Sequence, residues 1–374
     1  VKTGLLVAAL TVVWFLPFAI AMLVGQVEEH LRSRANETPL VLGHAGSALE
    51  LTFNALHFTK PDIVTFPYED AIQVNEEGKG QAIPLYARYS AGDYRIVGTT
   101  FDYFRFRDLE FETGRAFLRM GECVVGADVA VRNGIEVGDS VVSSPETLFD
   151  LAGVYPLRMS VVGVLASTGS PDDSAIFVDL KTTWIIEGLG HGHKEAAEAT
   201  DEERLDSADG GVVRLNASVV EYNEITPETM ESFHFHGELE NNPITAAVVI
   251  PRGVKEQALL KGQFASLPER QLVAPAAEMD ELFATVFSVQ RAVLSFLIFV
   301  GTATLALGIL TFTLSHRLRK REFLSLQMIG ASPGMLRGLV LFEATFVLLL
   351  SWILSSGLLA ALFQIAPAAI SRFF

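Results

Sequence analysis

Three long apolar runs organise this chain, at residues 5–24, 292–314 and 338–363. A helix of about 20 apolar residues spans the roughly 30 Å hydrocarbon core of a bilayer. The runs therefore predict three transmembrane helices. A long and mostly polar stretch separates the first run from the second, so we expect a large water-exposed domain after the first span.

Positive charge sets the orientation of these spans. The strongest basic cluster lies at residues 316–321, directly after the second run, and contains one histidine and four arginine or lysine side chains. Basic residues in short loops remain in the cytoplasm. The loop between the second and third spans is therefore predicted to be cytoplasmic. The large domain is predicted to be extracytoplasmic, which in a bacterium means a protein of the inner membrane with this domain in the periplasm.

The first run occupies the position of a signal peptide but is longer than a typical one, and no small-residue cleavage site follows it. Residues 26–34 continue in a polar, helix-compatible pattern. We expect a retained anchor whose helix projects out of the membrane. Because Lys2 is the only charge on its cytoplasmic side, we also expect a few residues to precede Val1.

The pattern between the spans predicts an α+β domain of two subdomains, carried on helical stalks. Strands are predicted at 39–42, 81–89, 94–98, 122–125, 140–143, 159–165, 175–178 and 244–250, and helices at 68–76, 128–133 and 254–266. Residues 188–211 have almost no large apolar side chain, which predicts a mobile loop. The expected order is span and stalk at 1–35, outer domain at 36–277, stalk and span at 278–315, cytoplasmic segment at 316–336, third span at 337–366 and outer tail at 367–374.

Composition narrows the class of protein. The net charge is −16, from 44 acidic and 28 basic residues, which argues against nucleic acid as a partner. The single cysteine, Cys123, excludes an internal disulfide, and its apolar neighbours predict a buried strand residue. Within the spans, Gly301, Thr304 and Gly308 share a helix face suited to close packing. Glu343 needs a partner at that depth, and Arg337 or a backbone amide is expected to supply it.

Two blocks carry a family resemblance, residues 122–140 with 159–169 and residues 321–337. They resemble the FtsX-like permeases of the MacB/LolC/LolE group, the mechanotransmitting (type VII) ABC transporters. The positions that match the outer-domain pattern are Gly126, Ala130, Gly134, Val137, Gly138, Asp139, Val162, Gly163 and Val164. The positions that match the cytoplasmic pattern are Arg321, Glu322, Phe323, Leu326, Gly330, Ala331 and Ser332.

From the residues alone, 135–139 predicts a strand leading into a tight turn, with Gly138 at positive φ and Asp139 capping the turn amides. The segment 321–334 predicts a short amphipathic helix that offers Phe323, Leu326, Gln327 and Met328 to a cytoplasmic surface. The bland alternative for this segment is a merely interfacial helix.

The resemblance implies that this helix couples the chain to a separate cytoplasmic ABC ATPase, which would bind the ATP and Mg²⁺. It also implies a second copy or a paralogue of the permease, and it leaves room for a periplasmic partner protein. The family normally has four spans, so we expect the fourth to be missing by truncation.

No catalytic site is predicted, because the phosphate-binding pattern G-x-x-x-x-G-K-[ST] and the zinc-protease and hydrolase motifs are absent from the sequence. The spacing of the histidines in the sequence suggests a metal site. His191 with His193, and His234 with His236, form two His-x-His pairs beside carboxylates. Because i and i+2 point the same way in an extended chain, each pair predicts two imidazole ligands for Zn²⁺ or Cu²⁺, with a solvated loop as the alternative.

Three classes of function compete. The first is the permease subunit of an ABC transporter that exports, extracts or releases a substrate. The second is a membrane-anchored outer receptor or sensor for a ligand or metal, which predicts a cytoplasmic output domain that the sequence lacks. The third, a tethered hydrolase, predicts a nucleophile and base that do not appear.

The orientation can be tested by cysteine labelling of whole cells. A membrane-impermeant thiol reagent should label Asp201→Cys from outside and should not label Arg319→Cys, because only the loop at 316–321 is strongly basic. The reverse pattern would overturn the predicted topology together with the permease interpretation.

Overall fold

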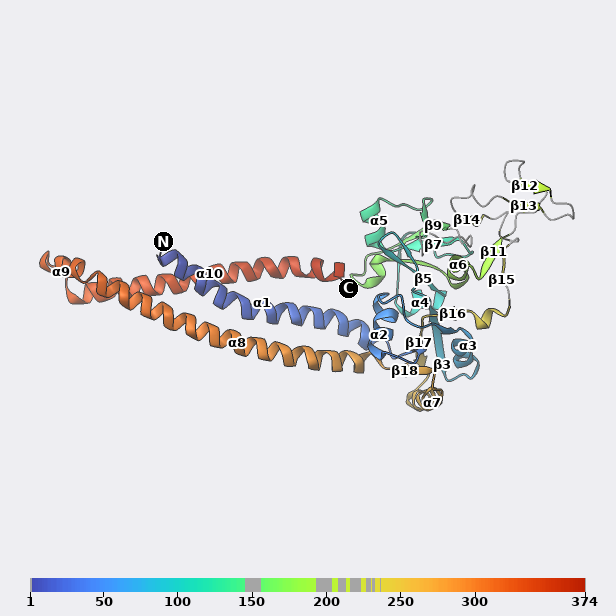
Figure 1. Ribbon diagram of the computed structural model, residues 1–374, viewed down its shortest axis with the longest axis horizontal. Coiled ribbons are helices and arrows are strands. Elements are labelled where there is room, and N and C mark those ends of the chain that lie inside the picture. Colours follow the sequence, from blue (N-terminus) through green and yellow to red (C-terminus); the bar gives the residue numbers. More distant parts are fainter. Residues whose placement is uncertain are drawn as a thin grey trace. The chain divides into compact units, whose positions relative to one another are not determined.

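The computed structural model describes residues 2–144, 156–192, 204–207, 213–215, 223–226, 230, 233–235 and 237–373. The chain divides into two compact units. The helical unit comprises Val1–Ser33 and Asp280–Phe373. The outer unit, Arg34–Met279, holds the sheets (Figure 1).

Three helices dominate the helical unit: α1 (Lys2–Glu37), α8 (Pro275–Leu318) and α10 (Pro333–Phe373). These are the helices of the described chain that are long and apolar enough to cross a membrane. The short helix α9 (Lys320–Met328) stands between α8 and α10. Helix α1 continues past Ser33, so that its last turn belongs to the outer unit.

Contacts between α1 and α10 combine apolar packing with hydroxyl groups. Val7 and Leu10 of α1 are buried against Val347 of α10. The Ser351 hydroxyl lies 2.7 Å from the carbonyl oxygen of Val347 and 3.3 Å from that of Val7. A hydroxyl that bonds across two apolar helices adds specificity to packing that lipid does not oppose.

The predicted small-residue face of α8 does contact α1. A Cβ atom added at Gly301 would lie 3.1 Å from the Val13 side chain, and one at Gly308 would lie 3.5 Å from Leu6. Thr304 instead donates its hydroxyl to the carbonyl oxygen of Val300. The two glycines thus allow the helices to approach closely.

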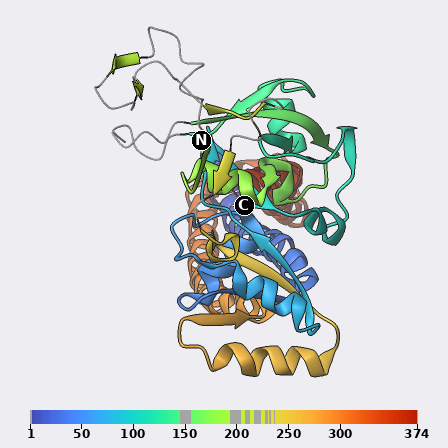
Figure 2. The same cartoon turned by 90° about the vertical axis from the view of Figure 1, so that its right-hand side faces the viewer.

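The smaller sheet of the outer unit is antiparallel, in the order β18 (Arg270–Val273), β1 (Leu40–His44), β17 (Ala246–Pro251) and β3 (Gly80–Leu85). Strands β1 and β17 carry continuous apolar runs that are buried. Three helices accompany this sheet, namely α2 (Ala48–His57), α3 (Glu69–Glu76) and α7 (Val254–Ala265). Helix α7 lies beside this sheet (Figure 2). Its Leu260 and Phe264 side chains are buried.

The larger sheet is mixed. Its order is β14 (Asn223–Glu224), β9 (Leu157–Leu165), β7 (Glu122–Val125), β10 (Ala175–Asp179), β5 (Tyr94–Thr99) and β4 (Ser90–Ala91), while β6 (Phe111–Gly114) and β8 (Ser140–Val142) also pair with β9. Strand β10 runs parallel to β5 and antiparallel to β7. Its residues from Ala175 to Val178 are buried, as expected for a strand covered on both faces.

Short helices connect these strands: α4 (Phe101–Phe106), α5 (Ala127–Asn133), the 3-10 turn η1 (Pro171–Ser174) and α6 (Leu180–Ile186). Three two-stranded sheets complete the described part of the outer unit. They pair β2 (Phe66–Pro67) with β16 (Pro243–Ile244), β11 (Gly190–Gly192) with β15 (Phe233–Phe235), and β12 (Arg204–Ser207) with β13 (Val213–Leu215). A further 3-10 turn, η3, spans Leu239–Asn241.

The two principal sheets correspond to the two predicted subdomains, but they share one hydrophobic core. Tyr86 and Gly98 join them by a reciprocal pair of backbone hydrogen bonds of 2.9 and 3.0 Å. Leu42 of the smaller sheet and Ile96 of the larger one belong to the same buried cluster.

Each predicted strand except the one at 135–139 overlaps a strand of the structure, and each predicted helix overlaps a helix. The pattern missed α2, α4 and α6. Helix α4 is rich in aromatic residues and α6 in β-branched ones, and both compositions favour strands over helices in isolation. Cys123 is buried, Gly138 has φ 103°, and Asp139 accepts the amide of Glu136 at 2.8 Å, as expected.

Several boundaries were wrong. Ile135 and Glu136 form no strand, and the turn that follows them is at Val137 and Gly138. Helix α10 continues to Phe373, so residues 367–373 of the predicted outer tail are helical. In the predicted mobile loop at 188–211, residues 190–192 and 204–207 form strands, and residues 193–203 and 208–211 lie outside the described chain.

Candidate functional site

The connection between α8 and α10, which the sequence predicts to be cytoplasmic, is the first candidate site. The predicted helix at 321–334 ends at Met328, because Gly330 adopts φ 105° and breaks the helical path. The amide of Ala331 then donates to the carbonyl oxygen of Leu326 at 3.0 Å. Ser332 accepts the amide of Met335 at 3.2 Å and caps α10, which begins at Pro333.

Arg319 holds this connection together. Its guanidinium lies 2.9 Å from Glu322 and 3.8 Å from Glu343, and it stands over the ring of Phe323. The expected partner of Glu343 was Arg337 or a backbone amide, and the structure places Arg319 beside it. Phe323 also packs against His316, with ring centroids 4.8 Å apart. These contacts tie the end of α8, α9 and α10 into one connection.

The predicted coupling residues divide between two faces of α9. Phe323 and Gln327 line an open groove of about 610 Å³ beside α10. Met328 and Ile329 are 84% and 83% exposed, and Leu326 is 41% exposed. Arg321 and Glu322 are exposed, while Gly330, Ala331 and Ser332 form the reversal between the helices. Leu326, Met328 and Ile329 therefore form an exposed apolar surface at the end of α9.

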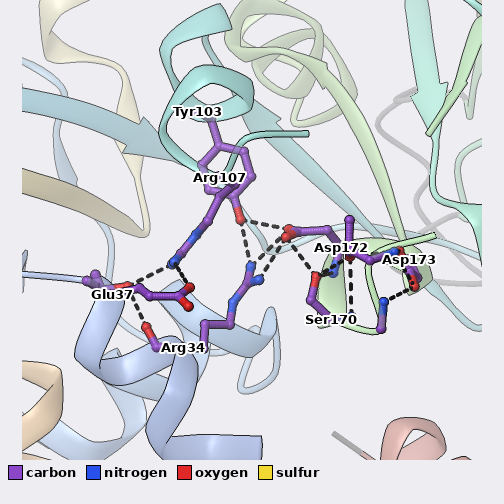
Figure 3. Close-up of polar contacts among 10 residues, drawn as sticks. Arg34, Glu37, Tyr103, Arg107, Ser170, Asp172 and Asp173 are labelled. Carbon is purple, nitrogen blue, oxygen red and sulfur yellow. Dashed lines mark hydrogen bonds and ion pairs between the residues drawn. The ribbon is translucent and has the colours of Figure 1, made fainter. Parts of the chain in front are cut away.

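The second candidate site lies where α1 ends inside the outer unit. Arg34 and Asp172 form a two-pronged ion pair, with Nη1 2.7 Å from Oδ2 and Nη2 2.9 Å from Oδ1 (Figure 3). Their side chains are only 7% and 2% exposed. The Tyr103 hydroxyl accepts from Arg34 at 2.8 Å and donates to Asp172 at 2.8 Å. The three groups close a triangle of charge-assisted hydrogen bonds.

Local geometry explains why Asp172 is in this position. The turn η1 is capped by Ser170, whose hydroxyl donates to Asp172 at 3.0 Å, and it opens with Pro171. The carbonyl oxygens of Asp172 and Asp173 pass so close to Gly126 that a Cβ atom there would lie 2.3 and 2.4 Å from them. Gly126, a position of the family pattern, thus lets η1 settle against the start of α5.

Aromatic side chains exclude water from the ion pair. The Arg34 guanidinium lies 5.7 Å from the ring centroid of Phe58, and Phe58 packs edge-on against Phe177 at 5.9 Å. The Tyr103 and Phe177 rings are 5.5 Å apart. Because Phe177 belongs to β10, this cluster lies directly on the central strand of the larger sheet.

A second arginine secures the end of the same helix. Arg107, at the end of α4, donates from Nη2 to the hydroxyl of Thr38 at 2.8 Å and lies 3.9 Å from Glu37. Thr38 in turn donates to the carbonyl oxygen of Arg34 at 2.9 Å. One of the last carbonyl groups of α1 is therefore satisfied by a side chain that is itself held by the domain.

The protonation states follow from these contacts. Burial acts to raise the pKa of Asp172, but the charge of Arg34 and the hydrogen bonds from Arg34 and Tyr103 outweigh it, so the pKa lies below its usual range. Burial acts to lower the pKa of Arg34, and the Asp172 charge reverses this. Burial raises the pKa of Tyr103. At neutral pH the cluster therefore holds a carboxylate, a guanidinium and a neutral phenol.

Sequence reasoning did not find this cluster, because its members are 69 and 138 residues from Arg34. Two local signals were available. Arg34 is the basic residue in the last turn of a helix, and Ser170 with Pro171 is a typical turn start before two carboxylates.

Of the four histidines proposed as metal ligands, the structure brings two opposite each other. His191 and His234 are directly paired across β11 and β15. His193 and His236 lie outside the described residues. Within the described chain, no group of three or more histidine, cysteine, aspartate or glutamate side chains is arranged to hold a metal ion.

Comparison with protein families decides the class. The model of the MacB-like periplasmic core domain matches residues 20–220, and the FtsX-like permease C-terminal model matches residues 294–374. The first match alone covers more than half of the 374 residues. This chain belongs to the MacB/FtsX-like ABC permeases. The permease is a membrane protein with three candidate spans and a large MacB-like outer domain.

Solved structures give weaker likenesses. The periplasmic region of MacB from Actinobacillus actinomycetemcomitans is 12% identical with a TM-score of 0.35, covering 70% of this chain and 97% of that one. The extracellular domain of the noncanonic ABC-type transporter YknZ from Gram-positive bacteria is 11% identical with a TM-score of 0.34, covering 63% and 98%. No curated protein matches the permease in sequence. The assignment therefore rests on the family models.

The ion pair predicts how acid affects the permease. The Asp172→Asn change should lower the free energy of unfolding at pH 7 by about 3–5 kcal/mol, because it leaves a buried guanidinium without its counter-charge. Since the folded pKa of Asp172 lies below the unfolded value of about 3.9, its contribution is present above that pH and is lost as pH falls through the folded pKa.

Denaturant unfolding of both proteins between pH 3 and 7 measures this effect. The difference between wild type and Asp172→Asn should be constant from pH 5 to 7 and should shrink below about pH 4. The neighbouring Glu37, Asp173 and Arg107 are the same residues in both proteins. A difference that grows on acidification would contradict the charge assignment.

Proposed function

We propose that this permease is the transmembrane subunit of an ATP-driven transporter whose ATPase is a separate cytoplasmic protein. The observation that carries the proposal is the exposed apolar tip of α9, formed by Leu326, Met328 and Ile329, on a connection that Arg319 ties to both neighbouring helices. The sequence contains no G-x-x-x-x-G-K-[ST] motif. ATP and Mg²⁺ would therefore bind in the partner.

The proposed mechanism is mechanical. Closure of the ATPase pair on ATP displaces α9, and the long helices α8 and α1 carry the movement to the outer domain. Helices α1 and α8 are each continuous from their apolar segment to the border of the outer unit, which supports this role. The outer domain then exports, extracts or releases a substrate, which need not cross the bilayer through this chain.

We propose that the permease lies in the inner membrane of a bacterium with its outer domain in the periplasm, as the distribution of basic residues predicts. The apolar segment of α8 has no residue buried within the chain. Lipid and a second copy of the permease, or a paralogue, would cover this surface. A periplasmic protein is a further candidate partner for the outer domain.

Charge on the α9 tip should break the partnership. In Met328→Asp and Leu326→Asp, a carboxylate would be desolvated in the interface, and loss of a central apolar contact typically costs about 2 kcal/mol or more, roughly a 30-fold weaker affinity. Affinity purification of the permease in mild detergent, followed by ATPase assay and mass spectrometry, measures the loss.

The matched control is Val131→Asp, at a position of α5 in the outer domain that is 82% exposed. This change should leave ATPase recovery unaltered. If Met328→Asp recovers as much ATPase as the control, α9 is not the docking surface. If no ATPase is recovered with the wild type, an outer receptor or sensor replaces the transporter as the better interpretation.

The pairing of His191 with His234 supports a second proposal, a Zn²⁺ or Cu²⁺ site that draws on these residues together with His193 and His236. Residues directly opposite in an antiparallel pair have their Cβ atoms about 5 Å apart, close enough for two imidazoles to share one metal. The site would serve regulation or delivery of metal on the outer side of the membrane.

Calorimetry of the full chain with Zn²⁺ or Cu²⁺ alone tests the metal proposal. We expect saturable binding with at best about micromolar affinity that weakens on acidification, because imidazole ligates as the neutral ring. Replacing all four histidines by alanine should abolish it, whereas His316→Ala should not. Absence of saturable heat from the wild type would remove the proposal.

A further inference from the structure

The end of α1 is attached to the outer domain at several points within a few residues. Arg34 contacts η1 and α4, Thr38 is held by Arg107, and the chain enters β1 at Leu40. Ala35 is fully buried beside these groups. Asn36 and Glu37 of the same turn are exposed, so the last turn of α1 is held to the outer domain by the side that carries Arg34, Ala35 and Thr38.

We propose that a joint made by Arg34, Asp172 and Tyr103 attaches the last turn of α1 to the central strand of the larger sheet. The joint prevents α1 from rotating about its axis and from sliding along it. Movement of α1 would enter the outer domain at this point. The inference deepens the proposed function, because it names the residues through which an ATP-driven displacement reaches the domain.

Geometry makes this joint selective for one orientation. A two-pronged pair between a guanidinium and a carboxylate requires the two planes to align, unlike a pair made by an ammonium group. The Tyr103 hydroxyl accepts a hydrogen bond from Arg34 and donates one to Asp172, so it also holds the two side chains at a fixed position beside the ring. A rotation or shift of α1 would leave two charges unpaired in a site enclosed by Phe58 and Phe177.

The joint differs from the ion pair that precedes it on α1. Arg32 pairs with Asp280 of α8 at 3.1 Å, but these side chains are 34% and 67% exposed. Solvent screens such a pair and lets it break and reform. Arg34, two residues later, is dry. The contrast places the rigid connection at Arg34.

The position of Asp172 determines where the displacement goes. Asp172 lies three residues before Ala175, the first residue of β10. Strand β10 is hydrogen-bonded on one side to β5 and on the other to β7. Tyr103 belongs to α4, which follows β5 after one residue. A displacement of Arg34 therefore acts on two neighbouring strands in the middle of the sheet.

Hydrogen exchange of the full chain in detergent, without any ATPase, tests the joint itself. In Asp172→Asn, amides at 34–38 and 170–175 should exchange at least about tenfold faster than in the wild type, because the local opening loses its charged contacts. The control is Asp70→Asn, which breaks the partly buried pair of Asp70 with Arg270 beside the smaller sheet. Its effect should remain near residues 70 and 270.

Milder variants guard against a failure to fold. Tyr103→Phe removes only the bridging hydroxyl and should accelerate exchange at 34–38 by about threefold, and Arg34→Lys, which keeps the charge without the fork, should fall between wild type and Asp172→Asn. Unchanged exchange at 34–38 in both Asp172→Asn and Tyr103→Phe overturns the joint.

The same readout in the complex with its ATPase tests transmission. With ATP and vanadate, wild type and Asp70→Asn should show altered exchange at both 320–328 and 171–179. In Asp172→Asn the change at 320–328 should persist while that at 171–179 is lost. An undiminished change at 171–179 overturns the joint and leaves the proposed function standing. If no ATPase binds, or if exchange at 320–328 does not change, the proposed function fails. The experiment without ATPase then tests the joint on its own.

Discussion

The packing around the end of α1 in the outer domain depends on a single buried ion pair. Once Arg34 and Asp172 are removed from water, each must be fully partnered, because an unpaired buried charge costs several kcal/mol, about 3–5 when one partner is lost. The Tyr103 phenol, the Ser170 cap and the missing Cβ of Gly126 all meet this requirement. The sheet and the helix end are thereby specified together, since neither can shift without exposing the other's charge.

The two candidate sites use the same device in different surroundings. At the cytoplasmic connection, Arg319 faces two carboxylates on exposed surfaces, where its contacts are screened by solvent and adjustable. At the outer end of α1, Arg34 faces one carboxylate in a dry aromatic pocket. The same residue type therefore makes an adjustable contact at one site and a fixed contact at the other. The difference between the two ends is one of solvation and not of residue type.

The spans, the strands and the family pattern could be predicted because each depends on local periodicity or on adjacent residues. The true end of α9 was also within reach, since Ser332 followed by Pro333 is a helix-start signal that contradicts a helix running to residue 334. The Arg34 joint was not, because pairing with Asp172 depends on how β10 and α4 fold around α1. The facing of His191 and His234 was hidden for the same reason, as it depends on the register of two distant segments.

Helix α1 leads into β1, and β18 leads into α8, and these two strands are paired antiparallel from Val41 with Val273 to His44 with Arg270. Both helices therefore attach at the same end of one hydrogen-bonded ladder. Forces that separate the helices would peel the ladder open one rung at a time from Val41, which requires little force. Forces that act on both helices in the same direction would leave the ladder unloaded. The ladder by itself therefore resists joint displacement of its two helices better than their separation, and the contacts of Arg34 with η1 and α4 reinforce α1 against separation.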